Sequence, residues 1–270
     1  MTRTVSVPSD LTGLLQPETV ELTRLGSLHD GGYVAPLAAL RGPVAVVSLG
    51  MKDDWSFEQA VVKRQPNALV HSYDPTVNPA SMIASLRLGV RSLLTFRDLT
   101  LWGRTKVIFS YYSFFRGRRH RHFREWVKSA SSPSGATSID RVLSRVDDNS
   151  KVLLKVDIEG DEYGVLDDFL SNPRSKDIIG IFVEFHDLDS RWNEFVDLQL
   201  RLFRDYHLVH VHANNINKVT TNRGIPRVLE MSYLRRGIDT PSGVRVHLPL
   251  AGLDYPNDRE REDYEFVFSN

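Results

Sequence analysis

The sequence predicts an open α/β fold built on a mostly parallel sheet. Three short apolar runs, 43–49, 152–156 and 178–183, are typical of strands that are buried on both faces. The first run is followed by Gly50 and a helical pattern, and the other two are followed by carboxylates. In open α/β sheets, ligands bind beyond the carboxyl ends of the strands. The glycine and the acids therefore predict a ligand site at one edge of the sheet.

Composition excludes several classes of protein. The 270 residues carry a formal net charge of +0, which argues against a global attraction to nucleic acid or anionic membranes. There is no cysteine, so disulfides, thiolate catalysis and cysteine-bound metals are ruled out. No apolar run is long enough to span a membrane, and the first ten residues lack the apolar core of a signal peptide. We expect a cytoplasmic protein of one domain, with residues 1–40 as a leader or cap segment and residues 41–270 as the main part.

A strand, a glycine turn and a helix are expected at the start of the main part. The strand at 43–49 passes through Gly50 into a helical pattern over 57–63. Only one glycine of the usual dinucleotide fingerprint is present, so this motif alone is weak evidence for a nucleotide site. Asp54 can also cap the helix that follows.

The second strand, over 69–73, ends at Asp74. That carboxylate lies roughly 20 residues beyond the glycine turn, where such folds place an acceptor for ribose hydroxyls. An ordinary Asp-Pro turn is the alternative. The pattern then predicts a helix over 78–88, a third strand over 92–96 and a further strand over 106–112.

A basic segment follows at 114–126, where five arginines and two histidines lie between aromatic residues. It could be a solvated surface, it could hold an anionic small substrate through its arginines, or it could bind RNA by phosphate contacts and stacking. The neutral total charge makes nucleic acid unlikely and leaves an anionic acceptor as the more favoured ligand.

Two pairs of polar residues mark the expected site. Asp157 and Glu159 are alternate residues at the end of the second apolar run, so both side chains could face one crevice. Capping of the next helix is the alternative for each acid. The third run ends in Glu184 and His186. Two buried strands that end in acids, one with a histidine, predict one shared crevice.

The last third of the chain is expected to complete the sheet. A strand over 207–212 ends at His212, and a last strand is expected over 226–233. Between these strands and the acidic site, the segment 192–203 has helical spacing of its apolar residues, which predicts a core-facing side formed by Trp192, Phe195, Val196, Leu200 and Phe203.

In this order, the motifs resemble those of the FkbM-type methyltransferases, a branch of the class I fold that uses S-adenosylmethionine. The resemblance covers roughly residues 24–268, and its most specific block is Leu154-Lys-Val-Asp-Ile-Glu-Gly160. The other matching motifs are Asp30-Gly-Gly-Tyr33, Ser48-Leu-Gly50, Asp54-Trp-Ser-Phe-Glu58, Tyr73-Asp-Pro-Thr76, Glu184-Phe-His186 and His212-Ala-Asn-Asn215.

The resemblance implies a Rossmann-like sheet of seven mostly parallel strands with one antiparallel strand, flanked by helices, and S-adenosylmethionine at the strand tips. It implies that Gly50 lies under the methionine part of the cofactor, Asp74 on the ribose and Asp98 near the adenine. Asp54 belongs to the same cofactor set, and Asp157 is expected beside the transferred methyl group. The multi-glycine loop that is usual in the family is reduced here to residues 48–53.

The expected reaction is O-methylation of a hydroxyl group on a sugar or natural-product acceptor. His186 is the candidate general base, with Asp157 as the alternative, while Glu159, Glu184 and His212 would position the acceptor. A divalent metal such as Mg²⁺ on Asp157, Glu159, Glu184 and His186 is a further option.

Two functions from other classes remain open at this point. The same carboxylates could serve a metal-dependent hydrolase, or the basic segment 116–124 could make the chain a non-catalytic nucleic-acid-binding module. The acceptor pocket is expected to be formed by the loops 1–40, 113–137 and 216–226. The sequence identifies neither the acceptor nor the oligomeric state.

Overall fold

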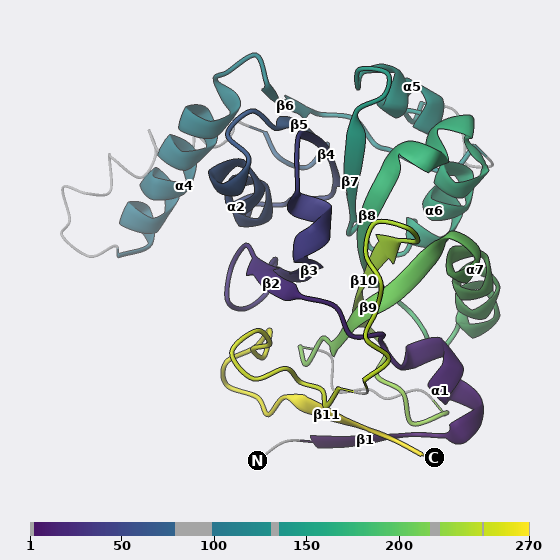
Figure 1. Cartoon of the computed structure of the whole chain (residues 1–270). Coiled ribbons are helices and arrows are strands. Elements are labelled where there is room, and N and C mark those ends of the chain that lie inside the picture. The colour runs from purple at the N-terminus through teal and green to yellow at the C-terminus, as the bar shows by residue number, and fades with distance from the viewer. Residues whose placement is uncertain (1–2, 79–98, 131–134, 217–221, 245, 270) are drawn as a thin grey trace.

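The computed structural model of the chain describes residues 3–78, 99–130, 135–216, 222–244 and 246–269, and Figure 1 shows their arrangement. A seven-stranded sheet forms the centre of the molecule, with the strand order β6-β5-β4-β7-β8-β10-β9. The strands are β4 (Val44–Leu49), β5 (Leu69–Tyr73), β6 (His120–Phe123), β7 (Lys151–Val156), β8 (Ile178–Phe185), β9 (Tyr206–Ala213) and β10 (Leu229–Arg235).

Only β10 runs antiparallel to its neighbours within the described part of this sheet. It pairs antiparallel with both β8 and β9, whereas the pairs β6–β5, β5–β4, β4–β7 and β7–β8 are parallel. The predicted fold class, a mostly parallel seven-stranded sheet with one antiparallel strand, is confirmed.

Helices cover both faces of the sheet (Figure 1). In that view α2 (Ser56–Arg64) and α4 (Leu99–Phe115) lie on the left, and α5 (Ile139–Ser144), α6 (Glu162–Ser171) and α7 (Trp192–Asp205) lie on the right. Successive side chains of a strand point to opposite faces. In β4, Ala45, Val47 and Leu49 therefore join one hydrophobic core, and Val44 and Val46 join the other.

The described part of the N-terminal segment, residues 3–40, packs against the rest of the chain. The strand β1 (Arg3–Val7) pairs in parallel with β11 (Tyr264–Phe268), and the helix α1 (Ser9–Leu15) follows it. The strands β2 (Leu22–Leu25) and β3 (Tyr33–Pro36) form an antiparallel pair. Two short 3₁₀ helices occupy Leu37–Leu40 and Pro173–Asp177.

Two expectations from the sequence were wrong. The strand expected over 106–112 lies inside the helix α4, where Ile108, Tyr111 and Phe114 are buried at helical spacing. Leu200 was expected on the core side of α7 but is 55% exposed, because Leu198 and Leu202 occupy the buried face.

The expected strand 92–96 and all but the first residue of the expected helix 78–88 lie outside the described residues. Within the described ranges, the sheet position beside β5 is taken by β6. No helix in those ranges has the length and apolarity needed to cross a membrane.

Candidate functional site

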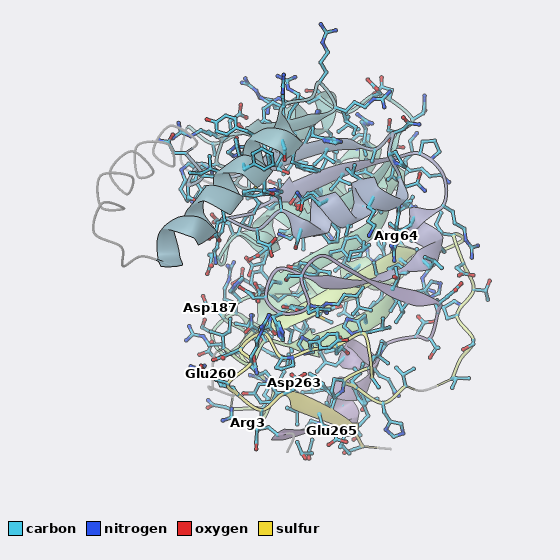
Figure 2. All side chains as sticks on the ribbon, turned by 90° about the vertical axis from the view of Figure 1, so that its left-hand side faces the viewer. Arg3, Arg64, Asp187, Glu260, Asp263 and Glu265 are labelled. Atoms are coloured by element: carbon cyan, nitrogen blue, oxygen red, sulfur yellow. The ribbon has the colours of Figure 1, made fainter. Side chains whose placement is uncertain are left out.

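The predicted site residues gather at the carboxyl edge of the sheet. Figure 2 shows this edge from the side: Asp187, which follows β8, lies on one side of the molecule, and Arg64, at the end of α2, lies toward the other. The turns after β4, β5 and β7 meet there through backbone hydrogen bonds. The Gly50 N–H donates to the Tyr73 carbonyl at 2.9 Å, and the Asp157 N–H donates to the Leu49 carbonyl at 2.9 Å.

Asp74 holds the turn that follows β4. Its Oδ2 accepts hydrogen bonds from the N–H groups of Met51 (3.0 Å) and Lys52 (2.8 Å). Its Oδ1 accepts from the N–H and Oγ1 of Thr76, at 2.8 and 2.5 Å. Burial alone would raise the pKa of Asp74, but these four hydrogen bonds lower it below its ordinary value. Asp74 is therefore an ionised support for the Gly50 turn, and its predicted ribose contact stays a prediction.

A cavity lies above these turns. It contains about 600 Å³ of space, part of it open to solvent, and Gly50, Asp74 and Asp157 all line it. Glu125, Trp126 and Val127, which follow β6, form another wall, and Trp126 is 54% exposed. The structure thus brings three of the predicted cofactor residues into one cavity.

Of the other two predicted cofactor residues, Asp54 does not line this cavity. Asp54 accepts a hydrogen bond from the Ser56 N–H at 2.7 Å, so its carboxylate caps the start of α2. Asp98 lies outside the described residues.

Lys52 and Glu159 form an ion pair at the cavity wall. The Lys52 Nζ donates to Glu159 Oε1 at 2.5 Å, and both side chains are more than half exposed. Both residues also have a positive φ, +45° for Lys52 and +56° for Glu159, which marks the two turns as sharply bent. This pair closes part of the cavity toward solvent.

Asp157 lies at the bottom of the cavity with part of its carboxylate unpaired. Its Oδ1 is buried and has no hydrogen-bond partner among the described residues, and its Oδ2 is 4.0 Å from the Nζ of the buried Lys155. Lys155 in turn donates to the Gly50 carbonyl at 2.8 Å. Asp157 therefore brings a carboxyl group with one unpaired oxygen to the wall of the cavity.

His186 is held by a residue that the sequence analysis did not single out. Glu162 Oε1 accepts hydrogen bonds from the His186 N–H (2.7 Å) and from His186 Nδ1 (3.2 Å). Its Oε2 accepts from the Gly160 N–H at 2.7 Å. Glu162 is fully buried and lies next to the central motif, but an acid at the first turn of a helix is too common to reveal this contact.

The other ring nitrogen of His186 faces two acids. Nε2 lies 3.7 Å from Glu159 Oε2 and 3.5 Å from Glu184 Oε2. Burial alone would lower the pKa of His186, but the hydrogen bond with Glu162 and the surrounding carboxylates raise it above its ordinary value. A histidine whose Nδ1 is held by a carboxylate has the fixed orientation that a general base needs.

Glu184 lies between Asp157 and the strand β10. Asn214 Nδ2 donates to Glu184 Oε1 at 2.6 Å. Burial and the negative charges of Asp157 and Glu230 raise the pKa of Glu184 well above its ordinary value. These surroundings therefore favour the protonated form of Glu184.

His212 is more deeply buried than the sequence suggested. It is 2% exposed, with Nδ1 3.2 Å from Glu230 Oε2 and Nε2 3.1 Å from Asp263 Oδ1. Burial alone would lower the pKa of His212, but these two acids raise it to about 10. Both ring nitrogens are thus occupied, and His212 is a buried cation that supports Glu230.

Part of the predicted metal set is close enough to share one ion. Asp157, Glu159 and His186 each offer a ligand atom, and these atoms lie within 4.8 Å of one another. Two carboxylates and one imidazole suit Mg²⁺ or Mn²⁺. The fit is geometric, and metal binding by these residues stays a prediction.

A family profile described as the methyltransferase FkbM domain matches residues 65–208, more than half of the chain. None of the curated proteins compared with the chain matches it.

Solved structures that are similar to the chain include a fibrillarin/Nop5p complex and the precorrin-6y C5,15-methyltransferase from Geobacter metallireducens GS-15. The first has a TM-score of 0.38 and 7% sequence identity, and the alignment covers 72% of this chain and 74% of that chain. The second has a TM-score of 0.35 and 12% identity, with 73% of this chain and 84% of that chain covered.

Proposed function

The chain belongs to the FkbM methyltransferase family, and we propose that it transfers a methyl group from S-adenosylmethionine to a hydroxyl group of a sugar or other small-molecule acceptor. The observation that carries this proposal is that a residue lining the cavity lies close to the candidate base His186. Glu159 lines the cavity, and its Oε2 lies 3.7 Å from Nε2 of His186. A methyl donor in the cavity and a proton acceptor beside it are the two requirements of O-methylation.

The cavity residues fit the cofactor. The bound cofactor would supply an electrophilic methyl group on a positively charged sulfur. The unpaired Oδ1 of Asp157 would then lie near a positive charge, which favours binding. Gly50 lets the turn after β4 pack directly against the turn after β7 in the wall of the cavity, and the half-exposed Trp126 offers an aromatic ring for the adenine.

His186 would act on the acceptor. A sugar hydroxyl is a weak nucleophile at neutral pH, so its proton must be removed as the new bond forms. Nε2 of His186 would take that proton, while Glu162 keeps Nδ1 protonated and the ring oriented. Glu184, whose Oε2 lies 3.5 Å from Nε2 of His186, would help to position the acceptor. Asp157 is the alternative base.

The family match does not support a metal-dependent hydrolase or a non-catalytic nucleic-acid-binding module. Of the arginines in the basic segment, Arg121 is exposed on the edge strand β6, whereas Arg119 precedes that strand and donates to Asn67 Oδ1 at 2.7 Å. The acceptor class remains part of the proposal.

Titration calorimetry with S-adenosylmethionine and S-adenosylhomocysteine tests the cofactor. We expect both to bind wild type, and we expect Asp74→Ala to weaken binding at least tenfold because the Gly50 turn loses its support. Asp148→Ala is the matched control, since the Asp148 side chain is 89% exposed and does not line the cavity. No binding of either ligand to folded wild type would overturn the proposal.

Turnover with a panel of sugars and hydroxylated small molecules tests the reaction. We expect His186→Asn to reduce turnover roughly 10²–10⁴-fold while cofactor affinity stays unchanged, because a general base contributes that much. A change below about threefold would remove His186 as the base. Loss of turnover in chelator, with recovery on addition of Mg²⁺, would indicate that the metal option applies.

A further inference from the structure

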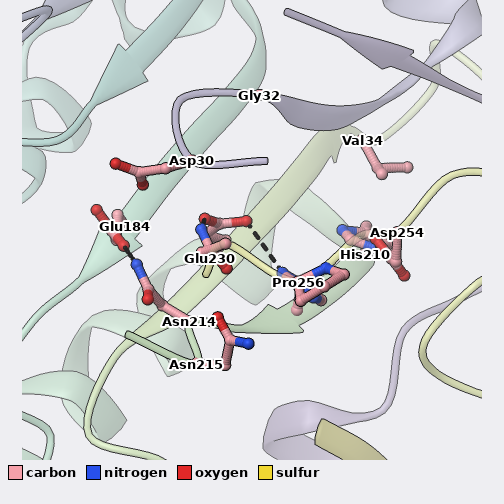
Figure 3. A network of polar contacts seen from close by, with 12 residues as sticks. Asp30, Gly32, Val34, Glu184, His210, Asn214, Asn215, Glu230, Asp254 and Pro256 are labelled. Carbon is pink, nitrogen blue, oxygen red and sulfur yellow. Dashed lines mark hydrogen bonds and ion pairs between the residues drawn. The ribbon is translucent and has the colours of Figure 1, made fainter. Parts of the chain in front are cut away.

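Three carboxylates form a second acidic group beside the site. Glu184 and Glu230 are direct partners in the antiparallel pairing of β8 with β10, so their side chains emerge on the same face of the sheet. Asp30 comes from the turn before β3 and covers them, as Figure 3 shows. A ligand atom from each of the three lies within 4.8 Å of the others.

Burial makes three neighbouring acids costly unless protons or cations offset their charge. Glu184 and Glu230 are each 6% exposed, and like charges directly opposite each other in a sheet are destabilising. Within the described part of the chain, no lysine or arginine forms an ion pair with any of the three acids. The side chains that contact them include Asn214, Asn257, His186 and the positively charged His212.

A buried amide supplies an independent sign of a ligand. Asn257 is 7% exposed, and its Nδ2 donates to Glu230 Oε1 at 2.5 Å, so the side chain points into the acidic group. Its Oδ1 is buried and has no hydrogen-bond partner among the described residues. A buried carbonyl oxygen without a partner is costly. Rotation of the amide by half a turn would direct this oxygen at the acids, where a bound cation could stabilise it.

We propose that Asp30, Glu184 and Glu230, together with the amide oxygen of Asn257, bind a divalent cation. Three carboxylates and one amide form the all-oxygen set that Mg²⁺, Mn²⁺ and Ca²⁺ prefer. Asp30 is exposed, which leaves a path for the ion from solvent. His212 contacts Glu230 through Oε2, which orients this carboxylate and leaves Oε1 on the Asn257 side.

An ion at this site would lie beside the candidate base His186 and could take part in the proposed reaction. Glu184 Oε2 is 3.5 Å from Nε2 of His186, so an ion on Glu184 would lie close to the acceptor. There it would bind acceptor hydroxyl oxygens and favour loss of a proton. This role rests on the proposed function, whereas binding of the ion does not.

Calorimetry of the chelator-treated full chain with Mn²⁺ alone tests the site, with electron paramagnetic resonance to count bound ions. We expect one site in wild type, weakened at least tenfold in Asp30→Asn and in Glu230→Gln. Glu159→Gln is the matched control, because Glu159 belongs to the other candidate group, and we expect it to bind Mn²⁺ as wild type does. Circular dichroism checks that each variant is folded, and the exposed Asp30 keeps the test valid if Glu230→Gln does not fold.

Three results would overturn the proposal. The first is no Mn²⁺ binding at millimolar concentration. The second is loss of binding in Glu159→Gln while Asp30→Asn still binds. The third is loss of binding in both variants, which would show that the ion depends on the group formed by Asp157, Glu159 and His186. Cofactor binding by the same metal-free protein is measured separately, so failure of the cation site and failure of the proposed methyltransferase are distinguishable.

Discussion

A methyl group at Gly50 would lie 1.7 Å from the backbone carbonyl oxygen of Asp157. The turns that follow β4 and β7 therefore touch, with no room between them for any side chain. Gly50 also has φ +78°, in the left-handed region that favours glycine. The floor of the cavity is fixed by this contact, which joins the predicted methionine-binding turn to the predicted catalytic acid.

Gly50→Ala should separate the two turns. We expect loss of cofactor binding and a fall in the free energy of unfolding well beyond the roughly 1–2 kcal/mol that left-handed strain costs alanine. Gly42→Ala is the matched control, because Gly42 has φ +82° and nothing within 4 Å of its missing Cβ. Urea unfolding and calorimetry measure both effects. Equal losses of stability in the two variants would show that the contact with Asp157 can relax.

The site residues at the ends of the parallel strands could be predicted from the sequence because the patterns that identify them are local. An apolar run that ends in Asp157, or in Gly50, identifies both the strand and the edge of the sheet on which the residue lies. Glu230 could not be found this way. Its position opposite Glu184 depends on the antiparallel register of two segments that are far apart in the chain.

The error over 106–112 has a similar physical cause. Its apolar and aromatic residues suit a strand by composition, and periodicity alone does not separate a short strand from a buried helix. The contact between Glu162 and His186 was also hidden, since it joins the start of one helix to the end of a strand. Local patterns thus predicted the strands, whereas the contacts that orient the candidate base His186 depend on tertiary packing.

Lys155 and Glu58 are expected to stabilise each other beneath the site. Lys155 is 2% exposed and Glu58 is fully buried, with no partner for either carboxylate oxygen among the described residues. Burial raises the pKa of Glu58, and the charge of Lys155 opposes that rise. We expect Lys155→Met to cost about 3–5 kcal/mol of unfolding free energy, because it leaves an uncompensated buried acid.

A double-mutant cycle distinguishes the electrostatic coupling between Lys155 and Glu58 from the packing that each substitution removes. Adding Glu58→Gln to Lys155→Met should recover part of the loss, with a coupling energy of roughly 1–3 kcal/mol by denaturant unfolding. Strict additivity of the two variants would contradict a direct electrostatic link.

Glu162→Gln should change the titration of His186. The carboxylate of Glu162 favours the protonated imidazole, so removing its charge should lower the pKa of His186. The neutral, proton-accepting form would then be present at lower pH, and the rising limb of the pH–rate profile should move the same way. Nuclear magnetic resonance of the histidine ring protons measures the pKa directly.

Glu194→Gln is the control for that titration. Glu194 pairs with Arg191 at the surface and is 55% exposed, so its charge should have little influence on the site. If the two variants shifted the pKa of His186 equally, the hydrogen bond from Nδ1 would not be the cause.

His212 should make stability depend on pH in the alkaline range. Its pKa is about 10 in the folded chain and 6.5 without the fold, so folding binds an extra proton between these values. The stabilisation is complete below pH 6.5 and is lost as pH rises toward 10. At about 1.4 kcal/mol for each pKa unit, the difference between wild type and His212→Gln should shrink by at most about 5 kcal/mol across that window.

His71 should make the stability of the fold depend on pH in the opposite direction to His212. Burial, assisted by the charges of Arg121 and Arg145, lowers the pKa of His71 to about 4, so the folded chain resists its protonation. Wild type should lose stability relative to His71→Gln as pH falls from 6.5 to 4, and should show no such change in the alkaline range. Urea unfolding of both variants from pH 4 to 10.5 tests the pair. A difference between wild type and His212→Gln that stays constant above pH 7 would mean that Glu230 and Asp263 do not hold a charged imidazole.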